Sequence, residues 1–194
     1  MKLYYSPGAC SLADHIALHE TGLPFEHERV HLKTKTLEDG SDYRAVNPKG
    51  YVPALTLDSG ETLSENIAIL DWITQQAPQL APAGHMGRTH LLEALAYIST
   101  EVHKGFAPIF KGASDEDQAK ARDSVAARLQ YLAEGMVGDY LLGPDLSVAD
   151  CYLFVMLLWA GKQGIEVPAD LAELKDRMMA RASVQKAMKH EGLL

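Results

Sequence analysis

Residues 1–14 read MKLYYSPGACSLAD, and this stretch decides how the first half of the chain folds. The first five residues are apolar apart from one lysine, which is typical of a short strand, and the Pro-Gly pair after them ends it. Ser11, followed three residues later by Asp14, predicts a capping box at the start of a helix that continues to about residue 20. Cys10 therefore lies at the N-terminus of a helix that follows a strand.

The chemistry expected of Cys10 follows from that position. Backbone N–H groups without partners and the helix dipole favour a negative charge at a helix N-terminus. We therefore expect the pKa of the thiol to be lowered and its thiolate fraction raised. A small buried cysteine that closes a turn is the alternative interpretation.

The chain has 194 residues, of which 47% are apolar and 23% charged, as in an ordinary soluble globular protein. Its net charge of −8 argues against a surface for nucleic acid or for an anionic membrane. No apolar run approaches the roughly 20 residues of a membrane span, and the N-terminus lacks the apolar core of a signal peptide. Cys10 and Cys151 are too few for a disulfide framework, so we expect a reducing, cytoplasmic setting.

Motifs for a metal ion or a nucleotide do not occur in the sequence. It contains no H-E-x-x-H motif, no C-x-x-C pair and no glycine-rich phosphate loop. We therefore expect no metal and no nucleotide cofactor.

The first 80 or so residues alternate strands with helices in a βαβ–ββα order. We expect strands at 2–5 and 25–32, hairpin strands at 54–58 and 61–64, and helices at 11–20 and from 65 or 66 to about 76. A Pro- and Ala-rich break at 77–84 separates this part from a helical second half.

In the second half, the apolar spacing predicts helices at 88–110, 115–136, 169–180 and 183–190, with Pro108 kinking or ending the first. Ser147 and Asp150 predict a capping box before an apolar run at 152–159, which is typical of a buried central helix. The pattern therefore predicts an α/β domain at 1–80 followed by an all-α domain at 87–194.

Two junctions in the first half are candidates for a ligand site. Val52-Pro53 is either an edge or turn feature or a cis-proline that presents the backbone N–H and C=O of Val52 to an extended peptide ligand. Glu65 and Asn66 are either a plain helix cap or a site for an amino-acid head group. In the second case Glu65 takes the ammonium group and the Asn66 N–H takes the carboxylate.

His103 and Lys104 lie within the first long helix of the second half. A lone helical histidine is usually structural, but a cationic pair that faces Cys10 across a cleft would stabilise a thiolate. Lys35 is either a solvated lysine or a partner for a ligand carboxylate. Cys151 is expected to be inert core.

Together these residues resemble the glutathione transferases, specifically the bacterial beta class. The resemblance covers essentially the whole chain and rests on a combination of motifs: YYSPGACSLA, NPKGYVPAL, SENIAIL, TEVHKGFAP and LSVADCYLF. It implies a thioredoxin-like N-terminal domain, an all-helical C-terminal domain and a homodimer. It also implies glutathione as co-substrate, with no metal.

The resemblance also implies a role for each matching residue. The catalytic residues that it implies are Cys10, Ser11, His103 and Lys104. The glutathione contacts that it implies are Lys35, Val52, Glu65 and Asn66. Tyr5 is another candidate hydroxyl, but the beta-class pattern favours Cys10.

The activity that the resemblance implies is conjugation of the glutathione thiolate to small hydrophobic electrophiles, a detoxification reaction in which nearby donors lower the pKa of the glutathione thiol. Two alternatives stay open. Cys10 could form a mixed disulfide with glutathione, which would make the protein a monothiol reductase, peroxidase or dehalogenase. The chain could instead be a non-catalytic carrier of apolar ligands, although the intact set of Cys10, Val52-Pro53 and Glu65 argues against lost catalysis.

Overall fold

The computed structural model describes all 194 residues, which form two compact units. The first unit comprises Met1–Pro78 together with Ala180–Leu194, and the second comprises Gln79–Met179. The last residues of the chain therefore group with the first half, whereas the sequence placed them in the helical domain. The other elements divide between the units as the sequence predicts.

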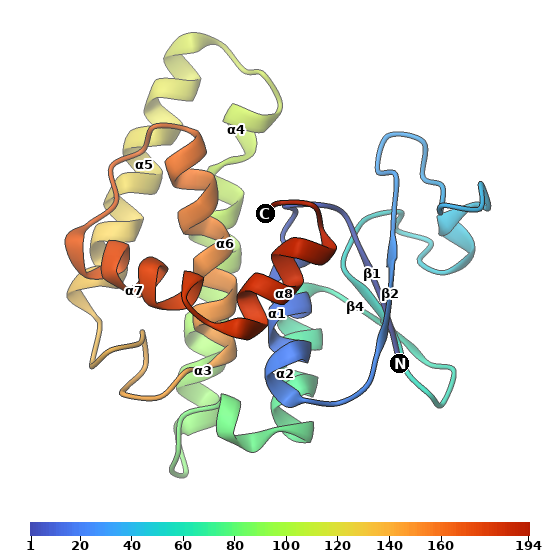
Figure 1. Cartoon of the computed structure of the whole chain (residues 1–194). Helices are drawn as coiled ribbons and strands as arrows, with labels where there is room; N and C mark the ends of the chain where they lie inside the picture. Colours follow the sequence, from blue (N-terminus) through green and yellow to red (C-terminus); the bar gives the residue numbers. More distant parts are fainter. The chain divides into compact units, whose positions relative to one another are not determined.

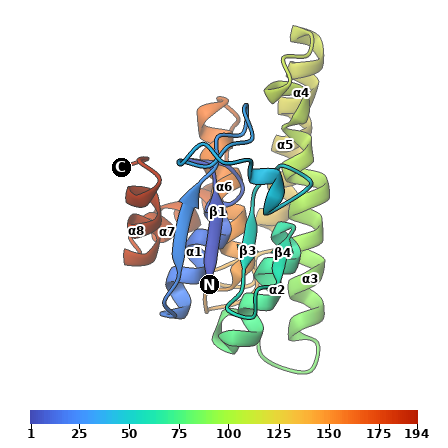
Figure 2. The same cartoon turned by 90° about the vertical axis from the view of Figure 1, so that its right-hand side faces the viewer.

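The first unit is built on a four-stranded sheet of order β2-β1-β3-β4. Its strands are β1 (Lys2–Tyr5), β2 (Glu26–Arg29), β3 (Ala54–Thr56) and β4 (Thr62–Ser64). Helix α1 (Leu12–Thr21) connects β1 to the parallel β2, and the other two pairings are antiparallel. Figure 2 shows the strands side by side in this order. The βαβ–ββα, thioredoxin-like order predicted from the sequence is confirmed.

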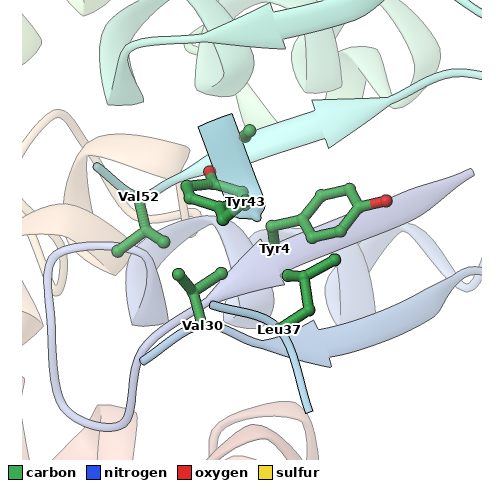
Figure 3. Close-up of a cluster of buried hydrophobic side chains, with 6 residues drawn as sticks. Tyr4, Val30, Leu37, Tyr43 and Val52 are labelled. Atoms are coloured by element: carbon green, nitrogen blue, oxygen red, sulfur yellow. The ribbon is translucent and has the colours of Figure 1, made fainter. Parts of the chain in front are cut away.

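The two faces of β1 bury different side chains, because successive residues of a strand point to opposite sides. Tyr5 packs against His15 of α1, with ring centroids 5.2 Å apart. Tyr4 points to the other face and joins a cluster of buried side chains from the segment between β2 and β3 (Figure 3). The labelled members of this cluster are Tyr4, Val30, Leu37, Tyr43 and Val52. Strand β2 is shorter than predicted because the chain leaves the sheet after Arg29, so that Val30 enters this cluster.

Helix α1 begins differently from the prediction. Ser11 precedes the helix with helical backbone angles, and its side chain makes no capping hydrogen bond. Its hydroxyl oxygen instead accepts from the backbone N–H of Ser6, at 3.2 Å. The predicted Ser11–Asp14 capping box is therefore wrong, because the hydroxyl group braces the preceding loop.

Helices α1 and α8 (Ala182–His190) lie side by side in the first unit (Figure 1). The Arg181 guanidinium group donates to both carboxylate oxygens of Glu20 in α1, at 2.6 and 2.9 Å. Just after α8, the buried Glu191 carboxyl group accepts from the backbone N–H of Gly8, at 2.8 Å, and lies 3.0 Å from Nδ1 of His15. Glu191 therefore connects α1 and the loop before Cys10 to the C-terminal segment.

The second unit is helical. It contains α3 (Gly87–Tyr97), η3 (Ile98–His103), α4 (Ala107–Phe110), α5 (Asp115–Glu134), α6 (Val148–Lys162) and α7 (Ala169–Met179). Two shorter elements, η1 (Tyr43–Ala45) and η2 (Pro78–Leu80), lie earlier in the chain, and α2 (Asn66–Gln76) belongs to the first unit. None of the helices is long and apolar enough to cross a membrane.

The single helix predicted at 88–110 is wrong in its second half. The chain passes from α3 into the π-helical turn η3, breaks, and restarts as α4 with Pro108 in its first turn. Proline fits the first turn because its missing N–H has no acceptor there. Short π-helical segments are frequent at functional sites, and this one carries His103.

Helix α6 is the buried centre of the second unit, as predicted. The Ser147–Asp150 capping box is present, with the Ser147 backbone N–H donating to Oδ2 of Asp150 at 2.8 Å. The other carboxylate oxygen of Asp150 accepts from the backbone N–H of Leu141, also at 2.8 Å. Cys151 is fully buried, as expected of a core residue.

The buried Glu191 gives a testable pH dependence. Burial raises its pKa from 4.5 to about 8, opposed by the Gly8 N–H. The folded state therefore holds this proton between those pH values, and the stability it contributes is lost as the pH rises through about 8. In EDTA, we expect Glu191→Gln to gain stability relative to wild type between pH 5 and 8, on the order of 1.4 kcal/mol per pH unit. Urea unfolding at pH 5, 7 and 9 measures this difference.

Glu166→Gln is the matched control, because it makes the same substitution at an exposed glutamate of the second unit. The free energy of unfolding of Glu191→Gln minus that of wild type should increase with pH. A difference that stays constant or decreases as the pH rises would contradict the assignment.

Candidate functional site

Cys10 lies in the turn between β1 and α1, as predicted, but its thiol is not activated there. Its Sγ atom donates to the carbonyl oxygen of Val52, at 3.7 Å. Burial, and next the nearby Asp14 carboxyl group, raise the pKa of Cys10 to about 12, against the lowering effect of the Cys10 and Ser11 backbone N–H groups. The expected lowering of this pKa is therefore wrong, because desolvation of the thiolate outweighs the helix N-terminus.

Val52, in the segment just before β3, is the residue whose carbonyl oxygen lies next to this thiol. The Val52–Pro53 peptide bond is cis, the sharper of the two sequence interpretations. The carbonyl group of the neighbouring Tyr51 is held by the Tyr43 hydroxyl at 3.1 Å and by the Asn47 side-chain amide at 2.8 Å. These bonds fix the backbone that carries the Val52 carbonyl beside Cys10.

Glu65 stands at the N-terminal cap of α2 with a positive φ of 78°, in a region that residues other than glycine rarely adopt. Such strain is concentrated at functional sites. Its carboxylate accepts from the Lys49 ammonium group and the Tyr51 hydroxyl, both at 2.5 Å, and the side chain is 54% exposed. The junction therefore presents a carboxylate to solvent beside a cation and a phenol.

Lys49 and Tyr51 were not among the residues predicted for the site. Both stand in the NPKGYVPAL motif that carries the resemblance, just before Val52. Their contact with Glu65 brings together positions more than ten residues apart, which the local sequence pattern does not reveal.

Asn66 serves the site through its side chain. Its Nδ2 atom donates to the Cys10 carbonyl oxygen at 3.0 Å and to Oδ2 of Asp14 at 2.9 Å. Its backbone N–H opens α2, where no acceptor within the helix exists, as the predicted role for a ligand carboxylate requires. Asn66 thus joins the Cys10 turn, α1 and α2 at one point.

Lys35 also has a positive φ, of 60°. Its backbone N–H donates to the His31 carbonyl oxygen at 2.7 Å, and its own carbonyl oxygen accepts from the Tyr43 N–H at 2.8 Å. The half-buried side chain runs past Gly50, in the turn before Val52. Its contact with a ligand stays a prediction.

His103 and Lys104 belong to the second unit, whereas the other six predicted site residues belong to the first. Nδ1 of His103 lies 2.6 Å from the Tyr152 hydroxyl. Burial, and then the adjacent Lys104, lower the pKa of His103, so the imidazole is neutral at physiological pH. The Lys104 side chain is exposed. That this pair faces Cys10 stays a prediction.

Comparison with known proteins decides the family. Family models for the N-terminal and the C-terminal domain of glutathione S-transferase match residues 9–76 and 97–182. The chain is also 43% identical over 200 residues to "Glutathione S-transferase GstA" of Escherichia coli O157:H7, a match that covers both chains completely. The chain belongs to the glutathione S-transferase family.

Solved structures agree with this assignment. This transferase is similar to a bacterial beta class glutathione S-transferase from Sphingomonas chungbukensis, with 47% identity and a TM-score of 0.93. It is equally similar to a sphingomonad glutathione S-transferase complexed with glutathione, with 48% identity and a TM-score of 0.93. Both matches cover 100% of each chain, and the resemblance seen in the sequence is confirmed.

The raised pKa of the Cys10 thiol gives a second test. We expect iodoacetamide to alkylate Cys10 at pH 7.5 at least tenfold more slowly than it alkylates free glutathione, because the thiolate fraction falls about tenfold per unit of raised pKa. The rate should show no inflection below pH 9. Mass spectrometry locates the label, and Cys10→Ala reports the background from the buried Cys151. An inflection below the free value of about 8.5 would restore the helix N-terminus argument.

Proposed function

We propose that this transferase conjugates the thiolate of glutathione to small apolar electrophiles. The observation that carries the proposal is the junction at α2, where the strained Glu65 presents its carboxylate and Asn66 ties the helix to the Cys10 turn. The candidate site for the amino-acid head group and the Cys10 thiol proposed to face the glutathione sulfur atom thus lie in the same unit. Family membership and a relative complexed with glutathione support the same activity.

The proposed pose lays the tripeptide extended along Val52. The γ-glutamyl ammonium group meets Glu65, and its carboxylate meets the backbone N–H of Asn66 at the helix N-terminus. Lys35 contacts a second ligand carboxylate. The Lys49 ammonium group lies 2.5 Å from the Glu65 carboxylate. It therefore holds the Glu65 side chain in place before the ligand arrives.

In the proposed reaction, the glutathione sulfur attacks an electrophilic carbon atom, and the leaving group departs with the bonding electron pair. Hydrogen bonds from Cys10, Ser11, His103 and Lys104 stabilise the thiolate, which lowers the pKa of the glutathione thiol so that its proton passes to water before the attack. The raised pKa of Cys10 suits this role, because a protonated thiol can donate a hydrogen bond to a neighbouring sulfur anion.

The same pKa separates this proposal from the mixed-disulfide alternative. A reductase, peroxidase or dehalogenase that acts through Cys10 needs its thiolate, and burial suppresses that form. Conjugation needs only the thiolate of glutathione, so we rank it first. A non-catalytic carrier would show neither activity.

The remaining proposals rest on the family resemblance. We propose that the protein is a cytoplasmic homodimer that serves in detoxification, with domain limits at 1–80 and 87–194. We include no metal ion in the conjugation reaction.

Two assays on one variant test the function. We expect wild type to conjugate glutathione to chlorodinitrobenzene, and Cys10→Ala to retain part of this activity because the attacking sulfur belongs to glutathione. Reduction of a small mixed disulfide should be abolished in Cys10→Ala and equally in Cys10→Ser, since neither side chain can form a disulfide bond. If wild type turned over neither substrate, the carrier would replace the enzyme. If both activities of a folded Cys10→Ala fell to background, Cys10 itself would be essential for activating glutathione.

Removal of the Glu65 carboxylate tests the binding pose. We expect Glu65→Ala to weaken glutathione binding at least tenfold, about 1.4 kcal/mol, a modest figure because the side chain is half-exposed before the ligand binds. Isothermal titration calorimetry measures the affinity, and circular dichroism checks the fold. Glu61→Ala, in the exposed hairpin between β3 and β4, is the matched control. A dissociation constant within twofold of wild type would remove Glu65 from the site.

A further inference from the structure

Four histidines gather in the first unit, and none of them is among the residues proposed for conjugation. His15 and His19 lie on α1, His27 on β2, and His190 at the end of α8. The His15 ring centroid is 5.1 Å from that of His27 and 5.5 Å from that of His190. His27 and His190 are stacked, with centroids 4.4 Å apart. Half of the chain's eight histidines therefore share one small volume.

The ring nitrogens of three of these residues converge. One nitrogen atom each from His15, His27 and His190 lies within 4.8 Å of the other two. Nε2 of His15 is 3.4 Å from Nδ1 of His190. Two ligands of a tetrahedral zinc ion, each bound at 2.0–2.1 Å, are about 3.3 Å apart. The His15–His190 pair already has this spacing, and the exposed His27 can rotate to complete a set of three.

A carboxyl group stands behind the buried member of the set. Oε1 of Glu191 lies 3.0 Å from Nδ1 of His15, on the side of the ring opposite to Nε2. Histidines that bind a metal commonly donate their other N–H to a carboxylate, which fixes the tautomer and raises the basicity of the ligand nitrogen. Glu191 is placed to do this for His15 once its carboxyl group has lost its proton, which a bound cation nearby favours.

A further nitrogen atom of the same cluster lacks a partner. The Nε2 atom of the neighbouring His19 is buried without a hydrogen-bond partner, so the cluster holds one more ring nitrogen than the protein itself satisfies.

We propose that His15, His27 and His190 form a binding site for a divalent transition-metal ion of the Zn²⁺ type, with the fourth position open to water. Three imidazole nitrogens suit Zn²⁺ and its neighbours Co²⁺, Ni²⁺ and Cu²⁺, whereas Ca²⁺ and Mg²⁺ require oxygen ligands. The bound ion joins α1, β2 and the end of α8. It therefore stabilises the folded first unit, because the unfolded chain holds these three residues far apart.

This site departs from the expectation of no metal. The ligands come from three elements separated by 12 or more residues, so no short motif contains them. The spacing of His15 and His19, four residues apart on one helix, was the one local signal that the sequence offered.

Zinc titration of the tag-free protein tests the proposal. We expect wild type to take up one equivalent of Zn²⁺ in competition with a chromophoric chelator, and its thermal midpoint to rise with Zn²⁺ concentration. The double variant His27→Gln/His190→Gln should lose at least tenfold in affinity and the thermal response. Both substituted side chains are exposed, so the metal-free midpoint should change little. His85→Gln, at an exposed histidine of the second unit, is the matched control and should bind as wild type does.

Two further measurements make the assignment specific. Co²⁺ in place of Zn²⁺ should give the intense visible absorption of a tetrahedral site, which the double variant should lack. Cys10→Ala should bind Zn²⁺ as tightly as wild type, which separates this site from a thiol ligand. Absence of zinc uptake by wild type, or affinity of the double variant within twofold of wild type, would overturn the proposal. Loss of binding in Cys10→Ala would do the same.

Discussion

The side-chain amide of Asn66 joins the three segments on which the candidate site depends. Its two N–H groups satisfy the Cys10 carbonyl oxygen and a carboxyl oxygen of the fully buried Asp14. Leaving such buried acceptors without a donor costs about 1–3 kcal/mol each. The amide thereby connects the turn of Cys10 to α1, and it holds the first residue of α2 next to both. The position of Glu65 follows, because it is the residue immediately before Asn66.

Much of the first unit could be predicted because its elements are separated by strong local signals. Pro7-Gly8 ends β1, and the Ser59-Gly60 turn closes the hairpin of β3 and β4. The predictions of secondary structure that proved wrong are those in which a residue or segment does something other than its local pattern suggests. Ser11 has the composition of a capping residue, but its hydroxyl group binds Ser6 instead. Apolar spacing through residue 110 looked continuous, whereas η3 changes the helical period at Ile98.

The sequence could place Cys10, Val52 and Glu65 at their junctions between elements, but it could not predict the electrostatics there. Sequence placed Cys10 at a helix N-terminus, and a helix N-terminus lowers a thiol pKa when the thiol is open to solvent. Here the thiol is half-buried and largely desolvated near Asp14, a residue that the sequence had assigned to a capping box. The histidine cluster was hidden for a related reason. Its members share no periodicity, since they come from a helix, a strand and the last helix of the chain.

The discontinuity of the first unit bears on how the protein is made. Gly8 lies just before Cys10, yet its N–H is held by Glu191, which the ribosome adds 183 residues later. The segment from Gln79 to Met179, continuous in sequence, has all of its residues before that partner exists. Domains generally fold as units during synthesis, the earlier ones first. In this chain the helical unit has all of its residues first, whereas the turn that carries Cys10, although synthesised earlier, cannot make its contact with Glu191 until that residue has been added.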